Sequence, residues 1–415
     1  MRKLNKICAV ALSVAALAVV SCESGDDSNV TDTYTTTEQD AFMSVYVDDV
    51  IMARYSELAT AGKTLLTAVE AIQSSTESDK TSLIATAAEA WVAARISWER
   101  TEAYLFGPVD MAGIDPGIDS WPLVLPDLQT SIQAWDTETD SYLSLKTDGG
   151  DLKGFHAIEY MLFADGSAKE VTIATFDSEY EISQGSLSDE GFEAKLESYA
   201  VAVCTELYRC VLQLEAEWDL SGLSSSKLTD YNAFGSNITM LFSEGNYAEI
   251  FKNPGLDNAY YSSFNVCLFA AFDGAIGITD EVANTKIADP IDAETESAGS
   301  GLLEVESWFS HNSISDFTNN MRGVKEAYMG TLCTDETSFD ALTTPATGSL
   351  GALVAAKDAT IGAEVVSTIN AALEAIKDMP SPFRDNLLNE ANKTAQDAIN
   401  AAAEALEAAN AIIEE

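Results

Sequence analysis

The sequence predicts an all-α protein built from two helical bundles. Apolar side chains recur every seven residues between positions 51 and 72, a spacing that places them on one face of a helix. The alternation of apolar and polar residues that marks half-buried strands is absent. Only 24 glycines and 9 prolines occur among the 415 residues, which is few for a loop-rich β protein. These observations together favour helices along the chain.

The helices of the first half are predicted from this periodicity and from the residues that end them. The seven-residue repeat supports one long helix over residues 37–73. A second helix covers residues 78–106 and ends at Gly107-Pro108, because proline cannot continue a helix. Further helices are predicted over residues 126–135, 154–163 and 191–218.

The second half is predicted to form a further series of helices after a short linker at residues 221–226. Its last helix, over residues 382–413, is rich in alanines at three-to-four spacing, so neighbouring helices can approach it closely. We therefore expect an N-terminal bundle over residues 38–220 and a C-terminal bundle over residues 227–415. The other helices of this half are predicted over residues 227–246, 258–273, 302–309, 314–330 and 350–377.

The N-terminus resembles the export signal of a bacterial lipoprotein. A basic start precedes an apolar stretch over residues 7–20 that is too short to span a bilayer comfortably, and Val19-Val20-Ser21-Cys22 resembles a lipobox. The resemblance implies a signal peptide over residues 1–21 and acylation of Cys22, with residues 22–37 as a flexible tether. We expect an outer-membrane lipoprotein, held to the membrane through Cys22, that faces the periplasm or the cell surface.

The chain is strongly acidic, with 67 acidic and 22 basic side chains and a formal net charge of −45. Such an excess repels the phosphates of nucleic acids and the headgroups of anionic lipids, which argues against a nucleic-acid-binding protein. A solvated acidic surface is the simplest interpretation, and attraction of cations is the alternative.

Four cysteines follow Cys22 in the sequence, and their pairing is left open. Cys204 and Cys210 fall on one predicted helix, where six residues place them on opposite sides, so they cannot bridge each other. The other two are Cys267 and Cys333.

The sharpest local pattern is Gly154-Phe155-His156-Ala157-Ile158-Glu159 on a predicted helix. Residues three apart share a helix face, so the His156 imidazole and the Glu159 carboxylate can converge on one cation. Metal proteins built on helical bundles use a comparable pairing. The alternative is a buried histidine whose hydrogen bonds are satisfied by its neighbours.

A second pattern places charged side chains within an aromatic helix face. At 100° per residue, Arg95 and Glu102 fall on the same face as Trp91 and Trp98, and Glu99 lies at the rim of that face. Burying such groups is costly unless they pair or bind something. One interpretation is a salt bridge from Arg95 to Glu102 or Glu99, and the other makes one of these glutamates an additional oxygen ligand.

A series of motifs resembles the imelysin family and spans nearly the whole chain after the signal segment. It includes the string from Arg95 to Pro108 and the Gly-x-His-x-x-Glu pattern at residues 154–159. The other matching segments are residues 118–122, 289–291, 294–296, 307–313, 316–320 and 380–383.

This resemblance implies an all-α, two-domain protein with its site at or near the domain interface. The family is associated with bacterial iron uptake at the outer membrane or in the periplasm, and it also carries a metallopeptidase label. The resemblance makes His156 and Glu159 the core of the site. It further brings in Glu99, Arg95 and Asp119, and then Ser310 and His311.

The sequence argues against peptidase chemistry. A His-x-x-Glu-His zinc motif would need a histidine where this chain has Tyr160, and His-Glu-x-x-His is also absent. His311 is the other histidine, so carboxylates would have to supply the remaining ligands, a set that suits iron at least as well as zinc. His311 is alternatively a residue at the start of a helix near Ile314, where Asn312 and Ser313 are good caps.

Three hypotheses follow from the sequence. The first is a lipid-anchored, non-catalytic protein that captures iron, with zinc as the alternative, as an ion or a metal complex for an outer-membrane uptake partner. His156 and Glu159 would ligate the metal, Glu99 or Asp119 would complete the shell, and Arg95 would orient a carboxylate. The second is a metallopeptidase that uses the His156–Glu159 pair, and the third is a surface interaction module without metal. The sequence assigns no catalytic residue.

Overall fold

The computed structural model describes residues 34–146, 149–174, 191–242 and 244–414, and it confirms the all-α fold. The predicted signal peptide, the lipidation site Cys22 and most of the tether lie outside the described residues. From Thr36 onward the chain forms one compact unit. The division into domains on either side of residues 221–226 stays a prediction.

The first half contains one long helical rod and several shorter helices. The rod consists of α1 (Thr36–Met43), a π-helical turn η1 (Ser44–Ile51) and α2 (Met52–Ser74). Then come α3 (Thr81–Glu99), the 3-10 turn η2 (Glu102–Tyr104), α4 (Pro108–Met111), α5 (Asp115–Ile118), α6 (Leu125–Ala134), α7 (Tyr142–Leu145), η3 (Gly150–Leu152), α8 (Gly154–Leu162) and α9 (Phe192–Asp219). A two-stranded antiparallel hairpin, β1 (Phe163–Ala164) and β2 (Ser167–Ala168), follows α8.

The second half is also helical. Its elements are η4 (Leu220–Gly222), α10 (Ser225–Phe234), η5 (Gly235–Asn237), α11 (Tyr247–Lys252), α12 (Phe264–Glu281), a π-helical turn η6 (Val282–Ile287), α13 (Ala288–Glu296), η7 (Gly301–Leu303), α14 (Ser313–Met329), α15 (Glu336–Asp340), α16 (Leu350–Lys357), α17 (Ala359–Lys377), η8 (Phe383–Asp385) and α18 (Glu390–Glu414).

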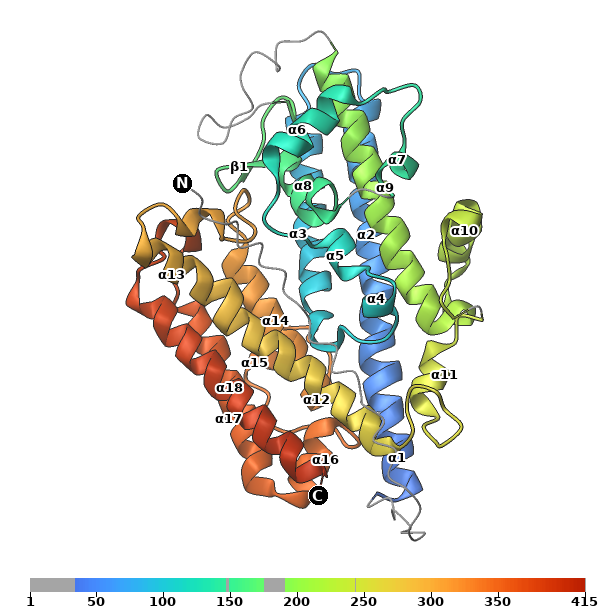
Figure 1. Cartoon of the computed structure of the whole chain (residues 1–415), viewed down its shortest axis with the longest axis vertical. Coiled ribbons are helices and arrows are strands. Elements are labelled where there is room, and N and C mark those ends of the chain that lie inside the picture. Colours follow the sequence, from blue (N-terminus) through green and yellow to red (C-terminus); the bar gives the residue numbers. More distant parts are fainter. Residues whose placement is uncertain (1–33, 147–148, 175–190, 243, 415) are drawn as a thin grey trace, which may run out of the picture. The chain divides into compact units, whose positions relative to one another are not determined.

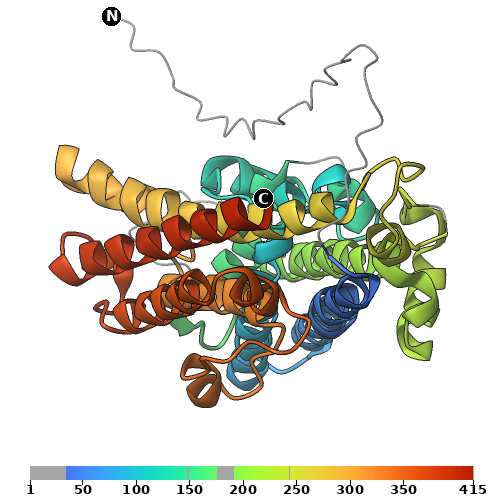
Figure 2. The ribbon, with the colours of Figure 1, turned by 90° about the horizontal axis from the view of Figure 1, so that it is seen from below.

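Two groups of helices pack within this unit. In the first group, α2 lies against α3 and α9, and α8 lies against α3 and α9. In the second group, α17 packs on α18, α16 and α14, and α12 packs on α18 (Figure 1). Seen from below, the orange-to-red helices of the second group lie on one side, and the blue-to-green helices lie on the other (Figure 2). Helix α17 is apolar and long enough to cross a bilayer, but here it packs against three other helices.

Two glycines allow the second group to approach the first closely. A Cβ on Gly323 of α14 would lie 2.6 Å from the carbonyl oxygen of Arg100, and a Cβ on Gly274 of α12 would lie 2.5 Å from that of Ala103. Real Cβ atoms do not come this near to backbone oxygens. Glycine at these positions therefore lets α12 and α14 rest directly on the turn after α3, which joins the two groups.

Several predicted helices differ from those found. The helix predicted over residues 78–106 ends at Glu99, the one over 258–273 is α12 (Phe264–Glu281), and the one over 382–413 begins at Glu390.

Three further differences have a local reason. The helix predicted over residues 350–377 is two helices, because the Asp358 carboxylate accepts hydrogen bonds from the amides of Thr360 and Ile361 and starts α17. The helix predicted over residues 227–246 stops at Gly235, whose φ is 53°. Residues 304–309 have an irregular backbone, and the positive φ of Ser307 (53°) is incompatible with a helix.

Candidate metal centre

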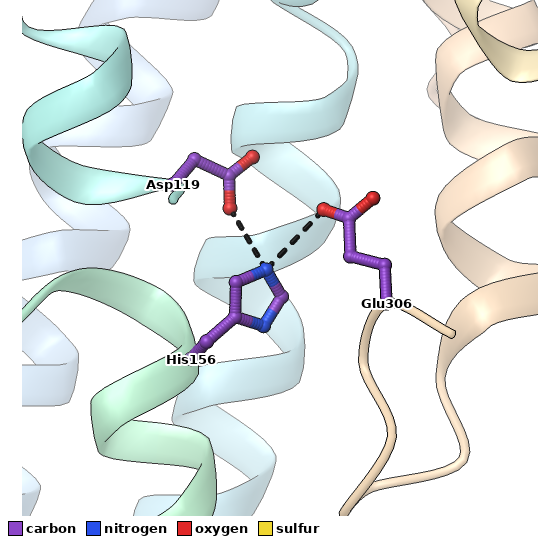
Figure 3. A group of neighbouring side chains, drawn as sticks. All are labelled: Asp119, His156 and Glu306. Carbon is purple, nitrogen blue, oxygen red and sulfur yellow. Dashed lines mark hydrogen bonds and ion pairs between the residues drawn. The ribbon is translucent and has the colours of Figure 1, made fainter. Parts of the chain in front are cut away.

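The candidate site is centred on His156 and is built by segments far apart in the sequence. His156 projects from α8, Asp119 follows the end of α5, and Glu306 comes from the segment that precedes α14 (Figure 3). The imidazole and the Asp119 carboxylate are buried, and Glu306 is only 8% exposed. His156 lies on a helix of the first group, Asp119 follows α5, which contacts that helix, and Glu306 precedes α14, a helix of the second group.

One ring nitrogen of His156 faces two carboxylates. Its Nε2 lies 3.3 Å from Oδ1 of Asp119 and 3.2 Å from Oε1 of Glu306. One ligand atom from each of these three side chains lies within 4.8 Å of the others, which is close enough for one metal ion to contact all three. An imidazole nitrogen with two carboxylate oxygens is a donor set that suits iron or zinc. The residues present therefore fit the metal that the sequence predicts.

A close approach of two backbones brings His156 to Asp119. Gly154 has a φ of +80°, and a Cβ on it would collide with the carbonyl group of Ile118. Glycine is therefore needed at the start of α8, because any side chain would push this helix away from the loop that carries Asp119.

The segment before α14 is fixed by its own hydrogen bonds, and these position Glu306. The Ser313 hydroxyl donates to the Glu306 carbonyl oxygen at 2.6 Å. The Ser307 hydroxyl and the Asn312 amide donate to the two oxygens of Asp316, at 2.5 and 2.7 Å. These bonds hold an irregular backbone in one conformation and direct the Glu306 side chain toward His156.

Glu159 contacts the other nitrogen of the imidazole. Its Oε2 lies 2.9 Å from Nδ1 of His156, and its Oε1 accepts hydrogen bonds from the amide and hydroxyl of Ser310, at 2.8 and 2.7 Å. The structure thus brings together the predicted residues His156, Glu159 and Ser310. A carboxylate bound to Nδ1 fixes the ring orientation and directs Nε2 at a ligand.

Arg95 joins the acidic side chains behind the imidazole. Its guanidinium contacts the Asp119 carboxylate, and its Nη2 lies 2.5 Å from oxygens of both Glu99 and Glu306. The predicted Arg95–Glu99 salt bridge is therefore present. The Trp98 indole donates to Oδ2 of Asp119 at 2.6 Å, so Asp119 is held from two sides.

A lysine that the sequence did not indicate completes the cluster. The Lys286 ammonium lies 3.2 Å from Oε2 of Glu306, 3.4 Å from Oε2 of Glu102 and 3.9 Å from Oε2 of Glu99. The Asn320 amide donates to Glu99 at 2.6 Å and also contacts Glu102. The predicted residues Glu99 and Glu102 therefore face Lys286 and Asn320, whereas His156 is faced by Asp119 and Glu306.

Charge is divided unequally within this cluster. Burial acts against ionisation of Asp119, but Arg95 and His156 hold its pKa down at about 2. Burial is likewise outweighed at Glu306, where Lys286 and Arg95 keep the pKa well below its usual range. Burial dominates at Glu102, whose pKa rises to about 8, and at Glu99, whose pKa rises well above its usual range. Negative charge is therefore concentrated on the two carboxylates that face Nε2.

The imidazole responds to these carboxylates. Burial alone would lower the pKa of His156, but its hydrogen bonds to Asp119, Glu159 and Glu306 raise that pKa well above its usual range. The ring therefore carries a proton at neutral pH when no metal ion is bound to it. A metal ion at Nε2 would take the place of that proton.

The second predicted histidine lies outside the cluster. His311 Nε2 is 3.5 Å from Oδ1 of Asp165, a residue in the turn of the β1–β2 hairpin, and the His311 backbone has a φ of 59°. Asn312 directly precedes the first residue of α14, but its side chain accepts no hydrogen bond from the amides of that helix, so the structure does not confirm the capping interpretation.

Glu306 is the residue of the three-ligand group that sequence reasoning missed. It directly precedes the segment 307–313 that resembles the imelysin family, and this adjacency was the one available signal. Lys286 had none, because it lies outside every predicted helix and matching motif, and a single lysine is ordinarily a surface residue.

An apolar cavity of about 310 Å³ lies beside the site. Trp121, Trp308 and Phe309 contribute its aromatic walls. The Trp121 ring also packs edge to face on the His156 imidazole, with centroids 4.9 Å apart. An aromatic ring thus covers the His156 imidazole on this side.

Comparisons with known proteins are consistent with one another. A family model described as Imelysin matches residues 51–413. Iron-regulated protein A of Synechococcus elongatus is 27% identical over 367 residues, which cover 87% of this chain and 83% of that protein. A crystal structure named as an iron-regulated protein A precursor from Parabacteroides distasonis has a TM-score of 0.73 at 27% identity and covers 92% of this chain and 97% of that chain. An imelysin-like protein from Psychrobacter arcticum shares the fold, with a TM-score of 0.56 at 10% identity over 92% of this chain and 95% of that chain.

Proposed function

Because the chain belongs to the imelysin family, we propose that it is an extracytoplasmic metal-handling protein that binds iron as cargo through Asp119, His156 and Glu306. The observation that carries this proposal is the His156 Nε2 atom, which faces two carboxylates whose pKa values are held low. The relative named iron-regulated protein A supports iron as the metal, and zinc is the alternative.

The remaining predicted residues take supporting roles in this proposal. Glu159, held by Ser310, orients the imidazole through Nδ1. Arg95 balances the charge of Asp119 and Glu306 and keeps both carboxylates in place. Acylation at Cys22 would tether the protein to the outer membrane, where it would pass the metal to an uptake partner.

The experiment is metal binding measured by isothermal titration with Fe²⁺ under anaerobic conditions and, separately, with Zn²⁺. We expect one equivalent to bind to the unchanged protein and binding to be lost in His156→Ala and weakened at least tenfold in Glu306→Gln. His311→Ala is the matched control, because it removes the chain's other histidine outside the cluster. Equal binding by all four proteins would exclude this site.

A further inference from the structure

Lys286 lies where its charge competes with the proposed cargo. The side chain projects from the π-helical turn η6, between α12 and α13, and is only 7% exposed. Its ammonium is 3.2 Å from Oε2 of Glu306, and Oε1 of that same carboxylate is 3.2 Å from His156 Nε2. The Glu306 carboxylate thus contacts the Lys286 ammonium through Oε2 and faces the proposed metal position through Oε1.

The ammonium has a second set of partners on its far side. Oε2 of Glu102 lies 3.4 Å from the nitrogen, and Oε2 of Glu99 lies 3.9 Å from it. Asn320 contacts both glutamates and holds them in place. A lysine carries its point charge on a flexible four-carbon stem, so a short movement toward Glu102 would release Glu306 without exposing the charge to solvent.

We propose that Lys286 is a tethered cation that the incoming metal displaces from Glu306, so that this lysine sets the affinity and the release rate of the bound metal. The inference rests on the proposed function, since it requires a metal at His156 and Glu306. Two like charges that share a carboxylate in a buried site repel each other strongly, because the surroundings screen them poorly. The lysine therefore keeps capture reversible, as a protein that hands its cargo on requires.

Lys286→Met tests this directly, because methionine keeps most of the side-chain volume and removes the charge. We expect Zn²⁺ or anaerobic Fe²⁺ to bind at least tenfold more tightly, and its release to a chelator in stopped-flow measurements to slow by a similar factor. Lys286→Arg retains the charge and should bind as weakly as the unchanged protein. Lys286→Gln offers a second neutral variant if the methionine variant does not fold.

Lys227→Met is the matched control, because it removes another buried lysine that lies outside the cluster. The Lys227 ammonium is 2.8 Å from Oε2 of Glu215. Its metal affinity should equal that of the unchanged protein. A purely structural role for Lys286 predicts lower thermal stability with equal or weaker metal binding in Lys286→Met, and that result would overturn the inference.

A double-mutant cycle locates the effect in the shared carboxylate. In a Glu306→Gln background, Lys286→Met should tighten binding by less than threefold, because the ammonium and the metal no longer share an anion. A full tenfold effect in that background would overturn the shared-carboxylate mechanism. If His156→Ala leaves metal binding intact, the proposed function itself fails. If metal binding depends on His156 but Lys286→Met does not change it, only the inference about Lys286 fails.

Discussion

In the proposed metal site, Glu159 orients the histidine without facing the metal position itself. Its two oxygens bind His156 on one side and Ser310 on the other, so the imidazole is fixed through Nδ1 and Nε2 is left to Asp119 and Glu306. Ser310 follows the irregular segment that carries Glu306. The same backbone therefore supplies Glu306, a proposed metal ligand, and Ser310, which holds the Glu159 carboxylate that orients the histidine.

Glu159→Gln should weaken metal binding about 10- to 100-fold while the protein remains folded, because the amide keeps the shape of the carboxylate and loses its charge. Affinity by isothermal titration, with circular dichroism to verify the fold, measures this. Ser310→Ala removes one of the two hydrogen bonds that Ser310 donates to Glu159 and should have a smaller effect. A Glu159→Gln variant with unchanged affinity would show that the imidazole needs no such partner.

Glu102 should make stability depend on pH. Burial raises its pKa to about 8 in the folded protein, against about 4.3 for an unfolded chain. The folded state thus holds the proton more tightly, so the stability this group contributes is fully present below about pH 4 and is lost as pH rises through about 8. Glu102→Gln does not titrate, so its free energy of unfolding relative to that of the unchanged protein should rise by roughly 4 kcal/mol between pH 5 and pH 9.

Urea unfolding at pH 5, 7 and 9 measures this difference. Asp110→Asn is the control, because Asp110 is an exposed carboxylate in the same part of the chain. A difference between Glu102→Gln and the unchanged protein that stays constant with pH would mean that Glu102 is ionised throughout this range.

At the same scale, the sequence singled out those residues of the candidate site that lie in recognisable motifs. His156 contacts Glu159 and Asp119, and Glu159 contacts Ser310. Glu306 lies 150 residues from His156 and joins it only through tertiary packing. No local spacing encodes such a contact, and a glutamate is one of many in so acidic a chain.

Among the elements, the segment between η7 and α14 matters most for the site. Its apolar and aromatic residues suggested a helix over 302–309, because a short apolar run resembles a buried helix as much as an irregular segment. Positive φ angles at Ser307 and His311 instead allow the chain to turn sharply and present Glu306 inward. Long amphipathic helices such as α9 were predicted to within a few residues, because their periodicity extends over many turns.

Gly323 should be needed for the contact between α14 and the turn after α3. An added Cβ would lie 2.6 Å from the Arg100 carbonyl oxygen, so Gly323→Ala should destabilise the protein by about 1–3 kcal/mol through forced separation of the two elements. Gly277→Ala on α12 is the matched control. Its Cβ would meet nothing within 4 Å, and it should stabilise the helix by about 0.5–1 kcal/mol. Chemical denaturation of both variants measures the contrast, and equal effects would refute the close-contact argument.

At the scale of the whole molecule, the proposed ligands come from both groups of helices. A metal that binds only the folded state stabilises it by mass action, by about 2.7 kcal/mol when its concentration is 100 times the dissociation constant. We expect metal to raise the melting temperature and to slow hydrogen exchange in α8 and in residues 304–312. The His156→Ala variant should show neither effect, and protection in that variant would place the metal elsewhere.

The acidic surplus also acquires a more specific meaning at this scale. Most of the 67 carboxylates are spread over the chain, but a small buried set is held near three basic groups, Arg95, His156 and Lys286. Composition predicted neither this concentration nor the unequal ionisation within it, because both depend on which side chains the fold buries together.

The position of Glu306 has a mechanical consequence. A cargo ion held between α8 and the segment before α14 would cross-link the two groups of helices. Loss of the ion would let the interface between these groups move more freely. Loaded and empty molecules would then differ in stiffness at the surface, several side chains away from the ion. A receptor that binds both groups of helices could therefore distinguish the metal-bound protein from the metal-free protein without contacting the metal.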